Sequence, residues 1–161
     1  MNEPELDEML SACAEPAPRR YSAENATEAD VSALRAAVFE FEPGIIYWYE
    51  TAHQTPWSVD QMWARRKELY NGGDAFVVIV DLSRAGRPDA EARQFLKEVA
   101  ADPKVSYFSV FTEKNILINA VARFVFSSVM PKGKFTLTKS RSVAIATARE
   151  RTAGGPARVG P

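Results

Sequence analysis

The chain has 161 residues, of which 46% are hydrophobic and 25% charged, the balance of a globular protein rather than a fibrous or disordered one. A chain of this length folds as one domain with a real core, since such a fold buries roughly 70% of its unfolded surface. The 20 basic and 21 acidic side chains leave a net charge of -1, so no overall field favours nucleic acid or an acidic membrane.

The two ends of the sequence differ in composition from the middle. Residues 1–30 and 152–161 hold few large apolar side chains and many Pro, Ala, Glu or Gly residues. Segments of this kind cannot bury enough surface to offset the entropy lost on ordering. We therefore expect mobile tails at 1–30 and 152–161 around a single domain at 31–151. A short helix is expected near Thr27, because Thr27 and Asp30 are spaced as a capping pair.

The N-terminal residues also bear on the compartment. They are acidic and lack a basic stretch followed by an apolar run, so they predict neither a secretory signal nor a transit peptide. Cys13 is the single cysteine, which excludes an internal disulfide framework and a thiol-based zinc site. We expect a cytoplasmic protein in a reducing compartment, with no metal and no cofactor.

The folded part is predicted to open with a β-hairpin. Residues 39–42 alternate apolar and acidic side chains, Pro43-Gly44 is a turn pair, and residues 45–49 are rich in strand-forming side chains. Alternation along the second strand sends Tyr47 to one face of the sheet and Trp48 to the other.

A helix is predicted after the hairpin. Ser58 and Gln61 are spaced as a capping box, and Trp57 can pack against Met62 as a hydrophobic staple. The Asn-Gly-Gly sequence at 71–73 predicts the end of this helix.

Strands and helices alternate through the rest of the sequence. The strands are predicted at 75–80, 105–111 and 134–138, the last at an edge, and the helices from Pro88, over 115–130 and from about Ser142 to Arg151. This order predicts an α/β fold with a mixed, mostly parallel sheet, an N-terminal hairpin and about four helices.

These patterns resemble the STAS-like superfamily, and within it the SpoIIAA-like bacterial proteins of STAS/SEC14 type. The resemblance covers roughly Val38 to Arg151 and rests on the hairpin, the strand ending AFVVIVDLS, the apolar helix after VSYFSVFT and the closing KFTLTKSRSVAIATARE. It implies a protein-interaction or small-ligand module without fixed catalytic residues. Anti-sigma-factor antagonists of this family carry a phosphorylatable Ser where the helix after the central strand begins. Neither Ser nor Thr stands there in this chain, so no phospho-switch is expected.

The loop after the central strand is the first candidate site. In an open α/β sheet, ligands bind beyond the carboxyl ends of the strands, and Asp81, Ser83, Arg84 and Arg87 lie there beside a predicted helix N-terminus. Backbone N–H groups, the helix dipole and two guanidinium groups favour an anion. The alternative is an exposed loop with scattered charge. A single glycine in this loop excludes a phosphate-cradling loop of the Walker or dinucleotide type.

His53, the single histidine, shares a loop with Glu50. A Glu–His pair can transfer protons. A metal site, however, needs further nitrogen or sulfur ligands, and a catalytic histidine needs a nucleophile. The sequence shows a pattern for neither. We therefore interpret His53 as a solvated loop residue and expect no enzyme activity.

The predicted helix at 115–130 has an apolar arc of about 200°, twice the arc that a surface helix needs. Ile116, Phe126 and Met130 project within its polar stripe, so we expect these three side chains to meet solvent or a partner. Three explanations compete: deep cover by the sheet and a neighbouring helix, a homodimer or partner interface, and a surface for lipid or an apolar ligand. A transmembrane span is excluded, because the run is short and contains Asn119 and Arg123.

The sequence thus predicts a non-enzymatic protein-interaction or regulatory module that pairs with itself as a homodimer or with a protein partner. The alternative is a carrier or sensor of a small apolar or anionic ligand, held between the apolar helix and the loop after Asp81. No nucleic-acid partner is predicted.

Overall fold

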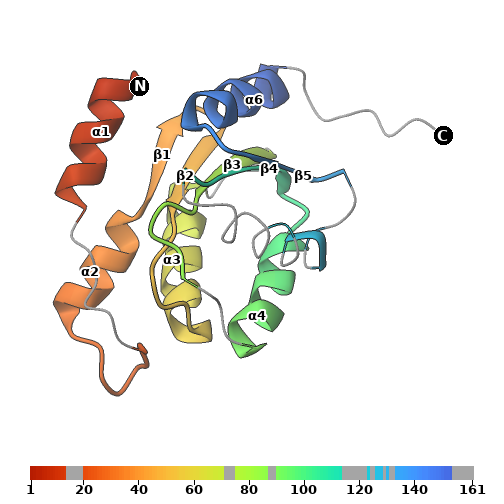
Figure 1. Cartoon of the computed structure of the whole chain (residues 1–161). Helices are drawn as coiled ribbons and strands as arrows, with labels where there is room; N and C mark the ends of the chain where they lie inside the picture. The colour runs from red at the N-terminus through yellow and green to blue at the C-terminus, as the bar shows by residue number, and fades with distance from the viewer. Residues whose placement is uncertain are drawn as a thin grey trace.

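A computed structural model describes residues 1–13, 20–70, 75–86, 90–113, 123, 126–128, 130 and 133–153. These residues form an α/β fold around a five-stranded sheet (Figure 1). The strands are β1 (Val38–Glu42), β2 (Ile45–Tyr49), β3 (Phe76–Asp81), β4 (Val105–Phe111) and β5 (Phe135–Thr138). The helices include α1 (Glu3–Ala12), α2 (Glu28–Ala36), α3 (Pro56–Leu69), α4 (Ala90–Ala100) and α6 (Arg141–Ala153).

The strands lie in the sheet in the same order as along the chain, β1-β2-β3-β4-β5. β1 and β2 form an antiparallel hairpin, whose turn contains Gly44 at a φ of 84°, a conformation that glycine adopts without a steric cost. The other neighbours are parallel: β2 with β3, β3 with β4, and β4 with β5. The predicted α/β class, the hairpin, the mostly parallel sheet and the edge position of 135–138 are therefore confirmed.

Different parts of the chain cover the two faces of the sheet. A right-handed crossover between neighbouring parallel strands puts its helix on a fixed side, so α3 and α4, which both lie inside crossovers, share one face. α6 and α1 lie on the opposite face (Figure 1). We call the first the crossover face and the second the terminal face. Their buried cores include Ile46, Trp48, Met62, Trp63, Val78, Val99 and Phe108 on the crossover face, and Leu6, Phe41, Tyr47, Ile79, Tyr107 and Ile145 on the terminal face.

Alternation within β2 decides which aromatic ring joins which core. Tyr47 is fully buried on the terminal face and stacks on Phe39, with 5.2 Å between the ring centroids. Trp48 lies in the crossover core, 6.0 Å from the ring of Trp63. The predicted opposite orientation of Tyr47 and Trp48 is thus confirmed.

The N-terminal residues depart from the prediction of a mobile tail. Residues 3–12 form α1, which Asn2 and Glu5 cap reciprocally. Leu6 and Leu10, one helical turn apart, are buried in the terminal-face core. Composition alone does not predict this packing, because two buried leucines are enough to hold a short helix once the rest of the fold offers a surface to pack against. The short helix predicted near Thr27 is confirmed as α2, with Thr27 as its N-cap.

The predicted capping box of the first crossover helix is wrong. The N-cap of α3 is Thr55, whose side chain accepts a hydrogen bond from the N–H of Ser58, while the Ser58 hydroxyl accepts one from the N–H of Thr55. The helix therefore begins at Pro56, a residue that suits a first helical position, and Gln61 lies beyond the first turn. The Thr55 hydroxyl also donates to the carbonyl of Tyr21, at 2.8 Å.

Several predicted features lie outside the described residues, namely the stop at 71–73, the helix start at Pro88 and most of 115–130. Residues 123 and 126–128 are helical. α6 runs to Ala153, so residues 152 and 153 belong to a helix rather than to the predicted tail. Among the described helices, none has the length and apolar content to cross a membrane.

Candidate functional site

The site lies where β2 ends on the crossover face. The backbone N–H of Glu50 donates to the carbonyl of Asp81 at 2.9 Å, which extends the pairing of β2 with β3 by one residue. Glu50 therefore follows the alternation of β2 and shares a face with Trp48, whose indole Nε1 donates to the Glu50 carboxylate at 3.1 Å. A carboxyl group is in this way carried into the crossover core.

A small cavity borders this carboxyl group. Its volume is about 30 Å³, which is room for about two water-sized groups. The walls come from the sheet, α3, α4 and the segment after β4, and the lining consists of Trp48, Glu50, Trp63, Val78, Val80, Leu96, Val99, Phe108, Phe126 and Met130. Glu50 is the one ionisable side chain among these described lining residues, so the lining that the structure describes is apolar, part aromatic and part aliphatic, with a single carboxyl group.

Burial dominates the electrostatics of Glu50. The residue is 3% exposed, and its desolvation raises the pKa of the carboxyl group to about 7. Hydrogen bonds from the side chains of Trp48 and Gln54 and from the backbone N–H of Thr51 lower this pKa. They offset only part of the rise that burial causes. No positively charged side chain of the described residues forms an ion pair with Glu50, and a buried carboxylate without a counter-ion is costly.

Two further oxygens beside Glu50 lack a partner. Thr51 is 2% exposed and Gln54 7%, and within the described part of the chain neither the Thr51 hydroxyl nor the Gln54 Oε1 atom has a hydrogen-bond partner. Buried polar atoms normally find one. The turn that follows β2 therefore holds two buried oxygens with unused hydrogen-bonding capacity, one of them a hydroxyl group that can also donate.

The loop after β3 is occupied by its own contacts. Asp81 is fully buried on the terminal face, where it accepts hydrogen bonds from the Tyr47 hydroxyl at 2.6 Å and from both the N–H and the hydroxyl of Ser83. The Arg84 guanidinium lies 3.6 Å from the centre of the Tyr49 ring. The structure thus brings Asp81 and Ser83 together. The N–H and hydroxyl groups of Ser83, which were expected to bind an anion, donate to the Asp81 carboxylate instead. Arg87 lies outside the described residues.

The strand order gives no reason to expect a ligand crevice at this loop. Ligand crevices of open α/β sheets lie where the strand order reverses, and the order here never reverses. The neighbouring loops close on one another instead: a Cβ atom added to Gly86 would lie 2.0 Å from the carbonyl oxygen of Ala52.

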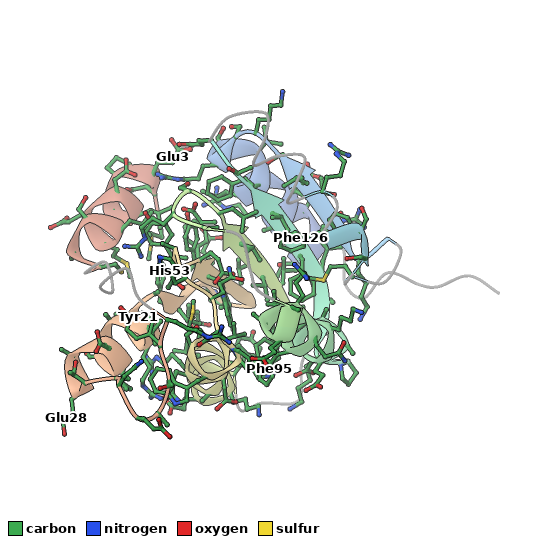
Figure 2. The ribbon with its side chains drawn as sticks, turned by 60° about the horizontal axis from the view of Figure 1, so that its bottom comes forward. Glu3, Tyr21, Glu28, His53, Phe95 and Phe126 are labelled. Atoms are coloured by element: carbon green, nitrogen blue, oxygen red, sulfur yellow. The ribbon has the colours of Figure 1, made fainter. Side chains whose placement is uncertain are left out.

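The remaining predicted residues divide between the surface and the cavity. His53 is exposed, and no hydrogen bond or ion pair joins it to Glu50 in the described structure. Phe126 and Met130 are half-buried: they pack against the crossover core and line the cavity, and they meet solvent only in part. Figure 2 shows Phe126 beside the strands of the sheet, and its ring lies 6.0 Å from that of Phe135. Ile116 lies outside the described residues.

The described His, Cys, Asp and Glu side chains form no group of three or more that could hold a metal ion. Comparisons of the chain with protein-family models, with curated proteins and with solved structures give no match. The resemblance to the STAS-like superfamily therefore stays a prediction, and the geometry of the cavity carries the functional argument alone.

Sequence reasoning singled out Glu50 but assigned it to the wrong surroundings. The available signal was its spacing of two residues from Trp48 at the end of a strand, which places both side chains on one face. The other walls of the cavity come from segments far apart in the sequence, and no local pattern shows that they meet.

Proposed function

We propose that this chain is a non-enzymatic, STAS-like binding module that senses or carries a small apolar ligand in the cavity beside Glu50. The observation that supports this function most strongly is the cavity itself, whose described lining is apolar apart from one buried carboxyl group. Binding sites for small molecules are mostly apolar and contain a few polar groups that orient the ligand. A regulatory role follows if the ligand changes the packing of Phe126 and Met130, which form one wall.

A protein-interaction role has less support. The one large apolar side chain that is strongly exposed among the described residues is Val143, and Phe126 and Met130 face the cavity. A homodimer remains the prediction from the sequence, and sedimentation at micromolar concentration tests it. If the wild-type protein sediments as a monomer and Phe126→Asp does not change its sedimentation, the homodimer prediction is wrong.

Xenon tests whether the cavity accepts an apolar guest, because xenon enters dry, apolar cavities without needing a polar partner. In spectra of ¹⁵N-labelled protein under xenon pressure, we expect saturable shifts of the Trp48 and Trp63 indole signals and none at Trp57, which does not line the cavity. A Val78→Leu variant, which fills the cavity, should lose these shifts, whereas Val143→Leu on the exposed face of α6 should keep them. Equal shifts in wild type and Val78→Leu would contradict the proposal.

A further inference from the structure

The proposed function calls for a ligand with apolar surface but leaves the charge of the ligand open, and the lining of the cavity restricts that charge. An anion is disfavoured, because the one ionisable group in the described lining is a carboxyl group. A purely apolar ligand would leave that carboxyl group without a counter-ion. A ligand that complements this lining therefore carries a positively charged hydrogen-bond donor.

The aromatic side chains that line the cavity also favour a positively charged ligand. Trp48, Trp63, Phe108 and Phe126 line the cavity together with Glu50. Aromatic faces attract cations through their quadrupole, and cages of such rings recognise methylated ammonium groups. The protein already uses this attraction close by, since the Arg66 guanidinium lies 3.8 Å from the centre of the Trp63 ring. Arg66 is held there by its ion pair with Asp102, so it does not neutralise Glu50.

The acceptors at the polar end supply the second observation. Glu50 accepts from the Trp48 indole and the Thr51 N–H, and neither of these donors carries a charge. In the same turn the buried Gln54 Oε1 and Thr51 hydroxyl oxygens lack partners within the described residues, although neither residue is among those that line the cavity. A ligand that donates an N–H bond to the Glu50 carboxylate complements this arrangement, whereas a ligand that only accepts hydrogen bonds offers that carboxylate no donor.

On the basis of the proposed function, we infer that the cavity binds a small organic cation of the methylated ammonium type, with Glu50 as its counter-ion and the four aromatic rings as its cage. The cavity volume of about 30 Å³ limits the ligand to a few heavy atoms, as in methylammonium or dimethylammonium. The cation restores the charge balance of the buried carboxylate, and its methyl groups contact the apolar wall.

The test compares two probes of nearly the same shape, dimethylammonium chloride and neutral dimethyl ether, at constant ionic strength and pH 8. Binding is followed by the indole signal of Trp48, which donates directly to Glu50. We expect dimethylammonium to bind at least tenfold more tightly than the ether. The Glu50→Gln variant should lose at least tenfold in affinity for the cation and keep its affinity for the ether within twofold. Glu40→Gln, which removes an exposed carboxylate on β1, should change neither.

The outcomes separate this inference from the proposed function. Equal affinities for the cation and the ether, or a Glu50→Gln variant that binds the cation as well as wild type does, would overturn the assignment of a cationic ligand while xenon binding still supports an apolar pocket. If neither probe nor xenon perturbs Trp48 or Trp63 in the folded protein, the pocket is not a binding site and both proposals fail. Circular dichroism of each variant verifies that the fold is kept.

Discussion

The hydroxyl group of Tyr47 donates a 2.6 Å hydrogen bond to the carboxylate of Asp81 in the terminal-face core. The two residues lie on neighbouring strands, and Asp81 is fully buried. Burial, followed by the nearby Asp81 charge, raises the pKa of Tyr47 far above its usual value, so this hydroxyl keeps its proton and remains a donor. The bond ties the end of β3 to the middle of β2.

Tyr47→Phe is expected to destabilise the fold by about 1–3 kcal/mol, because it leaves a buried carboxylate oxygen without its donor. Urea denaturation measures this loss. In a double-mutant cycle with Asp81→Asn, the two losses should not add, and the coupling should be about 1 kcal/mol or more. Additive losses would show that the hydrogen bond does not contribute to stability.

The contact between the loops after β2 and β3 predicts a steric effect. Gly86→Ala should cost about 3 kcal/mol, since its Cβ would lie 2.0 Å from the backbone oxygen of Ala52 and one loop must move. Gly133→Ala is the matched control: its φ is 80° and no atom lies within 4 Å of the added Cβ, so only about 1 kcal/mol of backbone strain is expected. Thermal unfolding of both variants gives the comparison, and equal losses would contradict the close approach.

The N-cap of α3 can be assigned by substitution. Thr55→Ala should lower the free energy of unfolding by about 1–2 kcal/mol, because it removes the acceptor for the N–H of Ser58 and the bond to Tyr21. Thr55→Ser should retain most of the stability. Gln61→Ala should change it by less than about 0.5 kcal/mol, as expected away from a cap. A larger effect at Gln61 than at Thr55 would restore the capping box predicted from the sequence.

The docking of α1 predicts a difference between its two faces. Leu6→Ala should cost about 2–4 kcal/mol, because Leu6 is fully buried against the terminal-face core. Glu8→Ala on the exposed side of the same helix is the control and should lie within about 0.5 kcal/mol of wild type. Guanidinium denaturation measures both variants. A Leu6→Ala variant as stable as wild type would mean that α1 does not contribute to the fold.

Glu50 predicts how stability depends on pH. Its pKa is about 7 in the folded protein and near 4.5 when exposed, so the folded state binds more protons between these values. Stability from this group is therefore fully present below about pH 4.5 and is lost as the pH rises to 7, by roughly 3 kcal/mol at most. Within the described part of the chain no charged side chain contributes to this pKa shift, and so Glu50→Gln should remove the pH dependence. The measurement is the wild-type minus Glu50→Gln stability difference from pH 4.5 to 8; a flat difference would contradict the raised pKa.

The elements that could be predicted from the sequence are those with a strong local signal. The continuous apolar run that became β3 and the alternation around Gly44 needed no tertiary information. α1 escaped prediction because a helix of ten residues is marginal by itself and gains its stability from a surface formed by Phe39 and Phe41 elsewhere in the chain. The start of α3 was misplaced because Ser58 can serve both as an N-cap and as the third residue of a helix capped by Thr55.

The candidate site was less predictable than the fold. The sequence drew attention to Asp81 and Ser83 through their position after a central strand, but their mutual hydrogen bonds appear only in three dimensions. The cavity depends on the packing of Trp63, Phe108 and Met130 around Glu50, and the distances between these residues along the chain conceal it.

The division of the sheet into two faces has a consequence for synthesis on the ribosome, where a chain emerges from its N-terminus. Each crossover can cover its own part of the crossover face as soon as the next strand appears. The terminal face instead waits for α6, which follows every strand in the sequence. Until residues 141–153 leave the exit tunnel, α1 is the one described helix that can cover apolar side chains such as Phe41, Ile79 and Tyr107 on this face. The apolar side chains of the terminal face are therefore most exposed to aggregation between the synthesis of β4 and that of α6.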